Sequence, residues 1–308
     1  MPRPDAFRCE QIGPCFAARV TGIDLSQPLS TETRDALIDA IDEHAVLVFP
    51  GQHLDEDAQV AFTAQFGELY TGVQMKILRN LNARMKHAAS SEISNIGKDG
   101  KPVGPGYAIA NVSIGTWQWH TDAVYEERPF RYSVLASIEA VEWGGETQFA
   151  DLRAAWDTLD PRLQALVEGR EATFYSHHNR HWLGFEDGPK RLRDYPPVRW
   201  PMVRTHPGSG RKVLWVDTRV TEVSGMSVPE GRALAADLVE HVGQRERVYS
   251  HAWRAGDVVL YDNRSVLHRG RRYDFNEPRR MRRCATWDDS RALGLGNWPE
   301  YLPDSEKE

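Results

Sequence analysis

Cysteine is scarce in this chain: the 308 residues include only Cys9, Cys15 and Cys284, and no Cys-x-x-Cys pair occurs. So few thiols support neither a disulfide framework nor a thiolate zinc site. Long apolar runs are also missing, and no stretch approaches the roughly 20 apolar residues that a membrane span requires. The segment from Met1 to Gln11 has no apolar run, so no signal peptide is expected. These absences favour a cytoplasmic protein without membrane contact.

An excess of positive charge is likewise missing, because the formal net charge is −6. We therefore expect no general attraction to nucleic acid or to anionic membranes. Apolar residues make up 41% of the chain, with ten Trp, ten Tyr and ten Phe, so a sizeable core is available. A single domain over residues 1–308 is expected, because β-rich domains with added helices reach this length. Association into a homo-oligomer is compatible with the sequence.

Helical patterns are few. A helix is predicted over residues 31–45, with Ser30 or Thr31 as its N-cap. A second pattern covers residues 151–168, and Pro161 is expected to divide it into two helices because proline disrupts a helix interior.

Two further helices are predicted from their caps. Asp55 is expected to cap one of them, with an inward face formed by Val60, Ala61 and Ala64. The clearest helix begins after Ser227, which forms a capping box with Glu230. Its apolar stripe comprises Leu234, Leu238 and Val242.

Short strand-like segments are more numerous, and each is bounded by Gly, Pro, Asp or Asn. They cover residues 46–49, 132–138, 213–216, 247–249 and 258–261. Many short strands with turns between them predict a mainly β fold with flanking helices, such as a jelly roll, and not a parallel α/β sheet. Residues 70–116 show little pattern, and a long segment of this kind is typical of an active-site lid.

One set of side chains is typical of a metal centre. His120 and Asp122 would share one face of a strand, and His268 follows the polar turn from Asp262 to Arg264. Two histidines and one carboxylate form the ligand set of a mononuclear non-heme iron site that leaves coordination positions open. A structural histidine beside a salt bridge is the alternative for His120 taken alone.

Other histidines offer competing interpretations. His53 and Asp55 repeat the His-x-Asp spacing, but a loop followed by a helix cap explains them, since a helical pattern begins directly afterwards. A rival metal site would consist of His177, His178 and His181, which lack an acidic partner at close spacing.

Several arginines follow the last candidate ligand. On a strand, Arg279, Met281 and Arg283 share one face, and Arg280 and Arg282 share the other. The planar guanidinium pairs with a carboxylate through two hydrogen bonds, so arginines facing the metal could hold two anions. The alternatives are a solvated, salt-bridged face or a nucleic-acid patch, and the negative net charge opposes the latter.

Together, these motifs resemble the iron(II)/2-oxoglutarate-dependent dioxygenases of the taurine dioxygenase class over nearly the whole chain. The resemblance is carried by His120-x-Asp122, Gly144-Gly145-Glu146-Thr147, Asp262-Asn263-Arg264, His268-Arg269 and the pair Arg279 and Arg283. It implies a double-stranded β-helix (jelly roll) core with flanking helices. It also implies an enzyme that uses Fe(II), 2-oxoglutarate and O2.

The resemblance assigns roles by position. It makes His120, Asp122 and His268 the Fe(II) ligands. It places Arg279 and Thr147 on the far carboxylate of 2-oxoglutarate. It gives Arg283 the acid group of the substrate, with Lys101 and Lys76 as further substrate contacts.

Three functions remain open at this stage. The first is oxidation of a small carboxylic acid, most closely an aryloxyalkanoate, with release of succinate and CO2. The second has a sulfonate or an alkyl sulfate as the gripped anion, because an arginine does not discriminate among these anions. The third is a non-catalytic jelly-roll binding protein. An aromatic pocket wall could come from Trp117, Trp119, Trp182 and Trp200.

Overall fold

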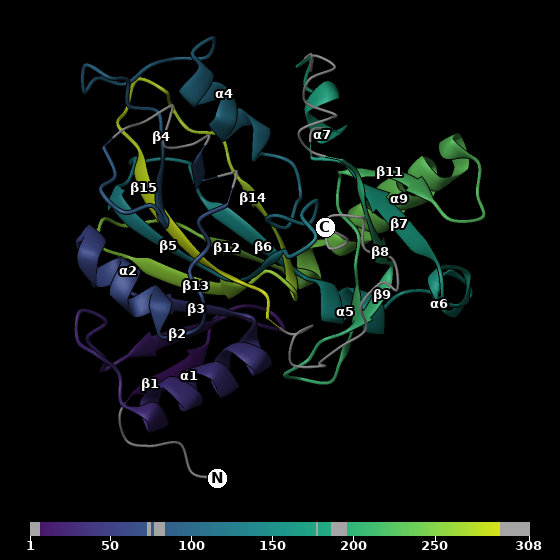
Figure 1. The fold of residues 1–308 in the computed structure, drawn as a ribbon, viewed down its shortest axis with the longest axis horizontal. Coiled ribbons are helices and arrows are strands. Elements are labelled where there is room, and N and C mark those ends of the chain that lie inside the picture. The colour runs from purple at the N-terminus through teal and green to yellow at the C-terminus, as the bar shows by residue number, and fades with distance from the viewer. Residues whose placement is uncertain (1–6, 73–74, 77–83, 177, 186–195, 290–308) are drawn as a thin grey trace, which may run out of the picture.

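The computed structural model describes residues 7–72, 75–76, 84–176, 178–185 and 196–289 of the chain. Within these residues the protein is mainly β with flanking helices, as the sequence predicts (Figure 1). None of the described helices has the length and apolarity needed to cross a bilayer.

The elements follow one another as short strands interrupted by helices. The strands are β1 (Arg8–Gln11), β2 (Ala18–Thr21), β3 (Val46–Phe49), β4 (Ser90–Ser94), β5 (Phe130–Glu139), β6 (Thr147–Asp151), β7 (Glu171–Phe174), β8 (Val198–Pro201), β9 (Val203–Thr205), β10 (Lys212–Leu214), β11 (Val220–Val223), β12 (Val248–His251), β13 (Val258–Asp262), β14 (Val266–Gly270) and β15 (Arg280–Trp287). The helices are α1 (Thr31–His44), α2 (Glu56–Ala64), α4 (Ala108–Gly115), α5 (Leu152–Asp157), α6 (Pro161–Val167), α7 (His178–His181), α9 (Val228–Val242) and the 3-10 helix η1 (Arg245–Arg247).

Two sheets build the part of the fold that carries the candidate site. A seven-stranded sheet has the order β1-β2-β3-β13-β5-β15-β4, and a three-stranded sheet has the order β12-β6-β14. Buried side chains of the large sheet, such as Val48 and Val259, belong to one cluster with Phe149 and Val266 of the small sheet. The two sheets therefore face each other across a common core, while α1 and α2 cover the other face of the large sheet (Figure 1).

The predicted helix boundaries follow from capping. Ser30 Oγ accepts a hydrogen bond from the Thr33 amide at the start of α1, and Ser227 Oγ does the same for Glu230 at the start of α9. Pro161 begins α6 directly after Asp160 caps it, so the run over 151–168 is divided as predicted. These predictions are confirmed because each depends on local hydrogen bonding.

The inward face predicted for α2 is wrong, although its cap Asp55 is correct. Gln59 and Phe62 are buried in place of Ala61 and Ala64. The Gln59 carboxamide donates to the carbonyls of Val134 and Arg282. A glutamine that satisfies buried backbone groups looks polar in the sequence, so the apolar pattern gave the wrong face.

The segment over 70–116 holds more structure than its sequence pattern predicts. Strand β4 pairs with β15 at the edge of the large sheet, and α4 contacts β4. Strand β14, which carries His268, is not among the predicted strands, whereas β15 covers the arginines whose side chains are expected to alternate on a strand. Whether the segment over 70–116 acts as a lid stays a prediction.

Candidate active site

The two histidines of the predicted centre are joined through their backbones. His120 and His268 form an isolated antiparallel bridge in which each amide donates to the carbonyl of the other, at 3.0 and 2.7 Å. Residues paired in this way carry their side chains on the same face, and the ring centroids lie 4.2 Å apart. The sequence suggested that His120 lies on a strand, but it lies in an isolated bridge. Its pairing with β14 still places its side chain on the same face as that of His268.

Asp122 is positioned by the polar turn that precedes β14. The Thr121 hydroxyl donates to the carbonyl of Asn263, and the Asp122 amide approaches the Asn263 side-chain oxygen at 3.3 Å. The turn is itself held by an ion pair between Asp262 and Arg264, with 2.6 Å between the charged atoms. The turn therefore fixes the backbone of Asp122 before any ligand is bound.

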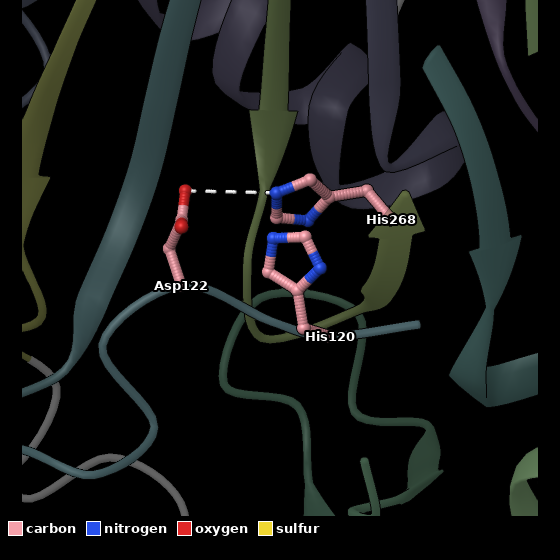
Figure 2. Close-up of side chains that lie close together, drawn as sticks. All are labelled: His120, Asp122 and His268. Atoms are coloured by element: carbon pink, nitrogen blue, oxygen red, sulfur yellow. Dashed lines mark ion pairs between the residues drawn. The ribbon is translucent and has the colours of Figure 1, made fainter. Parts of the chain in front are cut away.

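Figure 2 shows the side chains of His120, Asp122 and His268 pointing toward one another. One donor atom from each lies within 4.8 Å of the other two, and all three residues are buried. His268 Nε2 is 3.7 Å from Asp122 Oδ2. This arrangement could provide two nitrogen donors and one oxygen donor for a single ion.

The protonation of the two rings suits metal binding. His120 Nδ1 lies 2.7 Å from the carbonyl of Gln118, so this nitrogen carries the proton and Nε2 is free as a ligand. Burial lowers the pKa of His268 to about 4, and it lowers the pKa of His120 well below its ordinary value. Both imidazoles are therefore neutral near pH 7, the form that ligates a metal.

Positive charge around Asp122 keeps this candidate donor ionised. Burial would raise the pKa of Asp122, but the Arg283 guanidinium, together with His268, His120 and Arg219, holds this pKa well below the ordinary value. Arg283 Nη1 is 3.0 Å from Asp122 Oδ1. The remaining nitrogens of Arg283, Nε and Nη2, are buried and have no hydrogen-bond partner among the described residues.

Two other arginines of the chain bind a carboxylate through the guanidinium edge formed by Nε and Nη2. Arg153 uses Nε and Nη2 to hold Asp151, and Arg264 uses the same pair of nitrogens to hold Asp262. The matching edge of Arg283 lies in the pocket with no protein acid on it. Its geometry suits a carboxylate from a ligand.

Arg279 is a second buried cation of the pocket. Its Nη2 donates to the carbonyl of Gly145 at 2.9 Å, and it forms no ion pair with a carboxylate among the described residues. Burial lowers its pKa. Gly145 has a φ of +67°, and an added Cβ would lie 3.0 Å from Arg279 Nε, so the Gly144-Gly145 bend allows the strand start and the arginine to approach closely.

Thr147 begins β6 next to this bend. Its hydroxyl oxygen accepts a hydrogen bond from Trp253 Nε1 at 2.9 Å. The hydroxyl proton therefore remains available for an acceptor in the pocket.

The predicted residues thus meet in one pocket. It is lined by His120, Asp122, Thr147, His268, Arg279 and Arg283, among others. Met281 also lines it, whereas Arg280 pairs with Glu139 on the opposite side of β15. The predicted alternation of side chains along this strand is therefore confirmed, and Arg280 does not face the metal donors.

Other predicted residues lie elsewhere. Lys76 and Lys101 are exposed and are not among the residues that line this pocket. Among the four tryptophans, Trp117 lines it, Trp200 is buried in a separate core cluster, and Trp119 and Trp182 line a different cavity.

The rival histidine cluster is partly outside the described residues, because His177 is not among them. In the described part of the chain, His178 and His181 belong to no group of three metal donors. His53 lies in the loop two residues before the α2 cap Asp55, as predicted.

A second group of donors lies outside the pocket. Asp42, His206 and Asp262 meet the same distance criterion. His206 Nε2 is 2.9 Å from Asp262, which already pairs with Arg264. This guanidinium supplies the counter-charge, so we interpret the group as a structural ion-pair network that holds the turn before β14.

The comparisons with known proteins agree with this geometry. Residues 8–285 match the model of the taurine catabolism dioxygenase TauD, TfdA family. The chain belongs to this family. It is 44% identical over 279 residues to the alpha-ketoglutarate-dependent 2,4-dichlorophenoxyacetate dioxygenase of Cupriavidus pinatubonensis, covering 90% of this chain and 96% of the relative.

Two further relatives of this dioxygenase family are informative. The (S)-phenoxypropionate/alpha-ketoglutarate-dioxygenase of Delftia acidovorans is 33% identical over 280 residues, covering 87% of this chain and 91% of the relative. The crystal structure of AAD-2 in complex with Mn(II) and N-oxalylglycine superposes with a TM-score of 0.83 at 35% identity, covering 91% of this chain and 96% of that one. The resemblance inferred from the motifs is confirmed.

Several pocket residues of this family member were missed in the sequence. Tyr261 places its hydroxyl 3.2 Å from Asp122 Oδ2 and 3.5 Å from His268 Nε2. Arg219 donates to the carbonyl of Thr121 from the other side. Strand β13 is buried on both faces, so alternation alone could not indicate which of its side chains meets the metal donors.

We expect Tyr261→Phe to weaken metal binding about 10- to 100-fold, because groups that orient a metal ligand typically contribute that much. Calorimetric titration of the full chain with Mn(II) measures this change. Tyr249→Phe is the matched control, since it removes a hydroxyl that contacts His251 away from the pocket. Equal Mn(II) affinity in the two variants would show that Tyr261 does not position Asp122.

Proposed function

We propose that this protein is an Fe(II)- and 2-oxoglutarate-dependent dioxygenase that uses O2 to oxidise a small anionic substrate, with an aryloxyalkanoate as the favoured class. The proposal places Fe(II) on His120, Asp122 and His268. The far carboxylate of 2-oxoglutarate is placed on Arg279 and Thr147, and the substrate acid on Arg283.

The observation that carries the proposal is Arg279. Three metal donors alone fit many metal sites, but a buried guanidinium that forms no ion pair with any carboxylate of the described residues fits an acidic co-substrate. A buried charge is costly unless it is paired, so an anionic ligand is expected at this arginine. Its position in the same pocket as the metal donors favours a molecule that carries one acid to Arg279 and a second chelating end to the metal.

The residues present fit the proposed metal, since two neutral imidazoles and one ionised carboxylate are the donors that ferrous iron accepts. When bound, Fe(II) with 2-oxoglutarate and O2 supplies the oxidising chemistry, and succinate and CO2 are released. The chain itself positions the reactants. Arg283 holds the substrate acid through Nε and Nη2, while apolar side chains such as Leu135 and Met281 surround the rest of the pocket.

For an aryloxyacetate, held by its acid group, the carbon between the carboxylate and the ether oxygen lies closest to the clamp. Hydroxylation there gives a hemiacetal, whose collapse releases a phenol and glyoxylate. The two enzymes described above are named for phenoxy acids, which favours a carboxylate over a sulfonate or a sulfate as the gripped anion.

The finer features of the fold and setting are part of the same proposal. The two facing sheets and the 0.83 TM-score support a double-stranded β-helix core. We propose one domain over residues 1–308, with a lid at about 70–116 that brings Lys101 and Lys76 toward the substrate. A cytoplasmic location, the lack of nucleic-acid and membrane partners, and a homo-oligomeric state stay predictions from the sequence.

The proposal is tested by anaerobic addition of Fe(II) and 2-oxoglutarate to the purified chain. We expect a visible charge-transfer band that needs both additions, followed by substrate-dependent succinate release when O2 is admitted. Aryloxyacetates, alkyl sulfonates and alkyl sulfates are then compared at equal concentration. A chain that forms no band with both additions present behaves as the non-catalytic binding protein.

We expect Arg283→Lys to raise the KM for the substrate acid by at least about 30-fold, which corresponds to roughly 2 kcal/mol. Lysine keeps the charge but cannot form the paired hydrogen bonds of the guanidinium edge. Succinate release is measured against substrate concentration at saturating Fe(II), because Arg283 also contacts Asp122.

Arg280→Lys is the control for this measurement. Arg280 lies three residues away on the opposite face of β15 and pairs with Glu92 and Glu139. Its replacement is expected to leave the substrate KM unchanged. If Arg280→Lys raises this KM and Arg283→Lys does not, the assignment of the substrate clamp is wrong.

A further inference from the structure

A second cavity, of about 380 Å³, lies outside the pocket described above. Trp119, which precedes His120, and Arg269, which follows His268, both line it. Neighbouring residues of extended chain point to opposite faces. The cavity therefore lies behind the paired backbones that carry the two histidine donors.

Two arginines supply positive charge to this cavity. Arg269 stacks over the Trp119 ring at 4.3 Å and donates from Nε to the Gln148 side chain. Arg232 donates from Nε to the carbonyl of Thr221. Neither guanidinium forms an ion pair with an acid among the described residues.

Two acids, Asp217 and Glu240, also line the cavity. Asp217 is buried and pairs with Arg219, with 3.1 Å between the charged atoms. Glu240 lies on the exposed side of α9.

The rest of the lining is apolar. Val220, Ala235 and Val239 form one wall, and Trp182, which is 62% exposed, stands at another. An exposed indole beside two guanidinium groups that form no ion pair among the described residues suits a ligand with a flat apolar body and one acid group. A volume of this size is within the range of small-molecule sites.

We propose that this cavity is a second binding site, specific for an aryl carboxylate, in which Arg232 and Arg269 bind the acid and Trp182 contacts the ring. The class of ligand follows from the lining and does not depend on the reaction proposed above. A bound ligand would contact residues adjacent to both histidine donors.

The test is binding of 4-fluorophenoxyacetate to the full chain, followed by calorimetry and fluorine NMR. We expect two molecules per chain, and one molecule after Arg283→Gln. In the double variant Arg232→Gln with Trp182→Ala, the molecule in the second cavity should bind at least about tenfold more weakly, while the molecule at Arg283 stays bound. Both replaced residues are exposed, so the fold is expected to persist.

Arg199→Gln removes an exposed arginine from β8, outside both cavities, and should leave both molecules bound. A wild-type chain that binds one molecule, which Arg283→Gln abolishes, would overturn the second site. The second site would also be overturned if hexanoate displaced the probe from this cavity as effectively as phenoxyacetate does, because the aromatic ring would then contribute nothing to binding. If only the double variant loses a molecule and Arg283→Gln loses none, the second site stands and the role of Arg283 fails.

Discussion

Replacing His120 with alanine is expected to abolish both metal binding and turnover while the chain stays folded. His120 provides one of three buried donors, and its partner His268 is held through backbone hydrogen bonds that survive the change. Loss of a direct ligand should exceed the 10- to 100-fold loss of metal affinity that removal of an outer partner causes. Calorimetric titration with Mn(II) and circular dichroism measure the two quantities separately.

His178→Ala is the matched control. His178 is a buried histidine of the rival cluster, and it belongs to neither group of metal donors among the described residues. It should retain metal affinity and turnover. Wild-type metal affinity in His120→Ala, or its loss in His178→Ala, would contradict the assignment. Asp122→Ala is less informative, because it leaves Arg283 buried without its ion-pair partner Asp122 and should destabilise the fold by about 3–5 kcal/mol.

Arg279→Gln is expected to raise the 2-oxoglutarate concentration needed for half-maximal turnover by roughly 30-fold or more. A charge-assisted contact of a buried group is worth about 2–5 kcal/mol, and 2 kcal/mol corresponds to about 30-fold. The apparent KM for 2-oxoglutarate, measured at saturating Fe(II) and substrate, gives the change.

Thermal unfolding distinguishes this role from a structural one. Without 2-oxoglutarate, Arg279→Gln should unfold at the same temperature as the wild type or higher, because it removes a buried charge that forms no ion pair with a carboxylate in the described part of the chain. With saturating 2-oxoglutarate, the wild type should gain stability and Arg279→Gln should not. Arg280→Gln, which breaks ion pairs with Glu92 and Glu139, should leave the effect of 2-oxoglutarate intact. A large destabilisation of Arg279→Gln without ligand would identify Arg279 as a structural residue.

The sequence predicted helix boundaries well and helix faces less well. Caps such as Ser30 and Ser227 act within one turn, so their effect is visible locally. The buried face of α2 depends on Gln59, which bonds to backbone groups of β5 and β15. No pattern within the helix itself reveals that those groups will lie beside it.

In the candidate site, too, local features were predictable from the sequence, and features that depend on distant contacts were not. The donor types and the spacing of Arg279 and Arg283 are properties of the sequence, because side-chain alternation on a strand follows from backbone geometry. The roles of Tyr261 and Trp253 are not, since Tyr261 contacts Asp122 and Trp253 contacts Thr147, and each pair is more than 100 residues apart in the sequence. Lys76 and Lys101 carry the right charge, but the structure gives them exposed positions.

By itself, the sequence determined the family of this protein, its mainly β character, and the candidate metal donors and arginines of its pocket. These depend on residue type, short spacing and local hydrogen bonding. Only the tertiary structure decided that His120 and His268 pair through their backbones, that Arg279 forms no ion pair with a carboxylate of the described residues, and that a second cavity lies behind the histidines. Those features arise from contacts between segments far apart in the chain, which burial and packing select together.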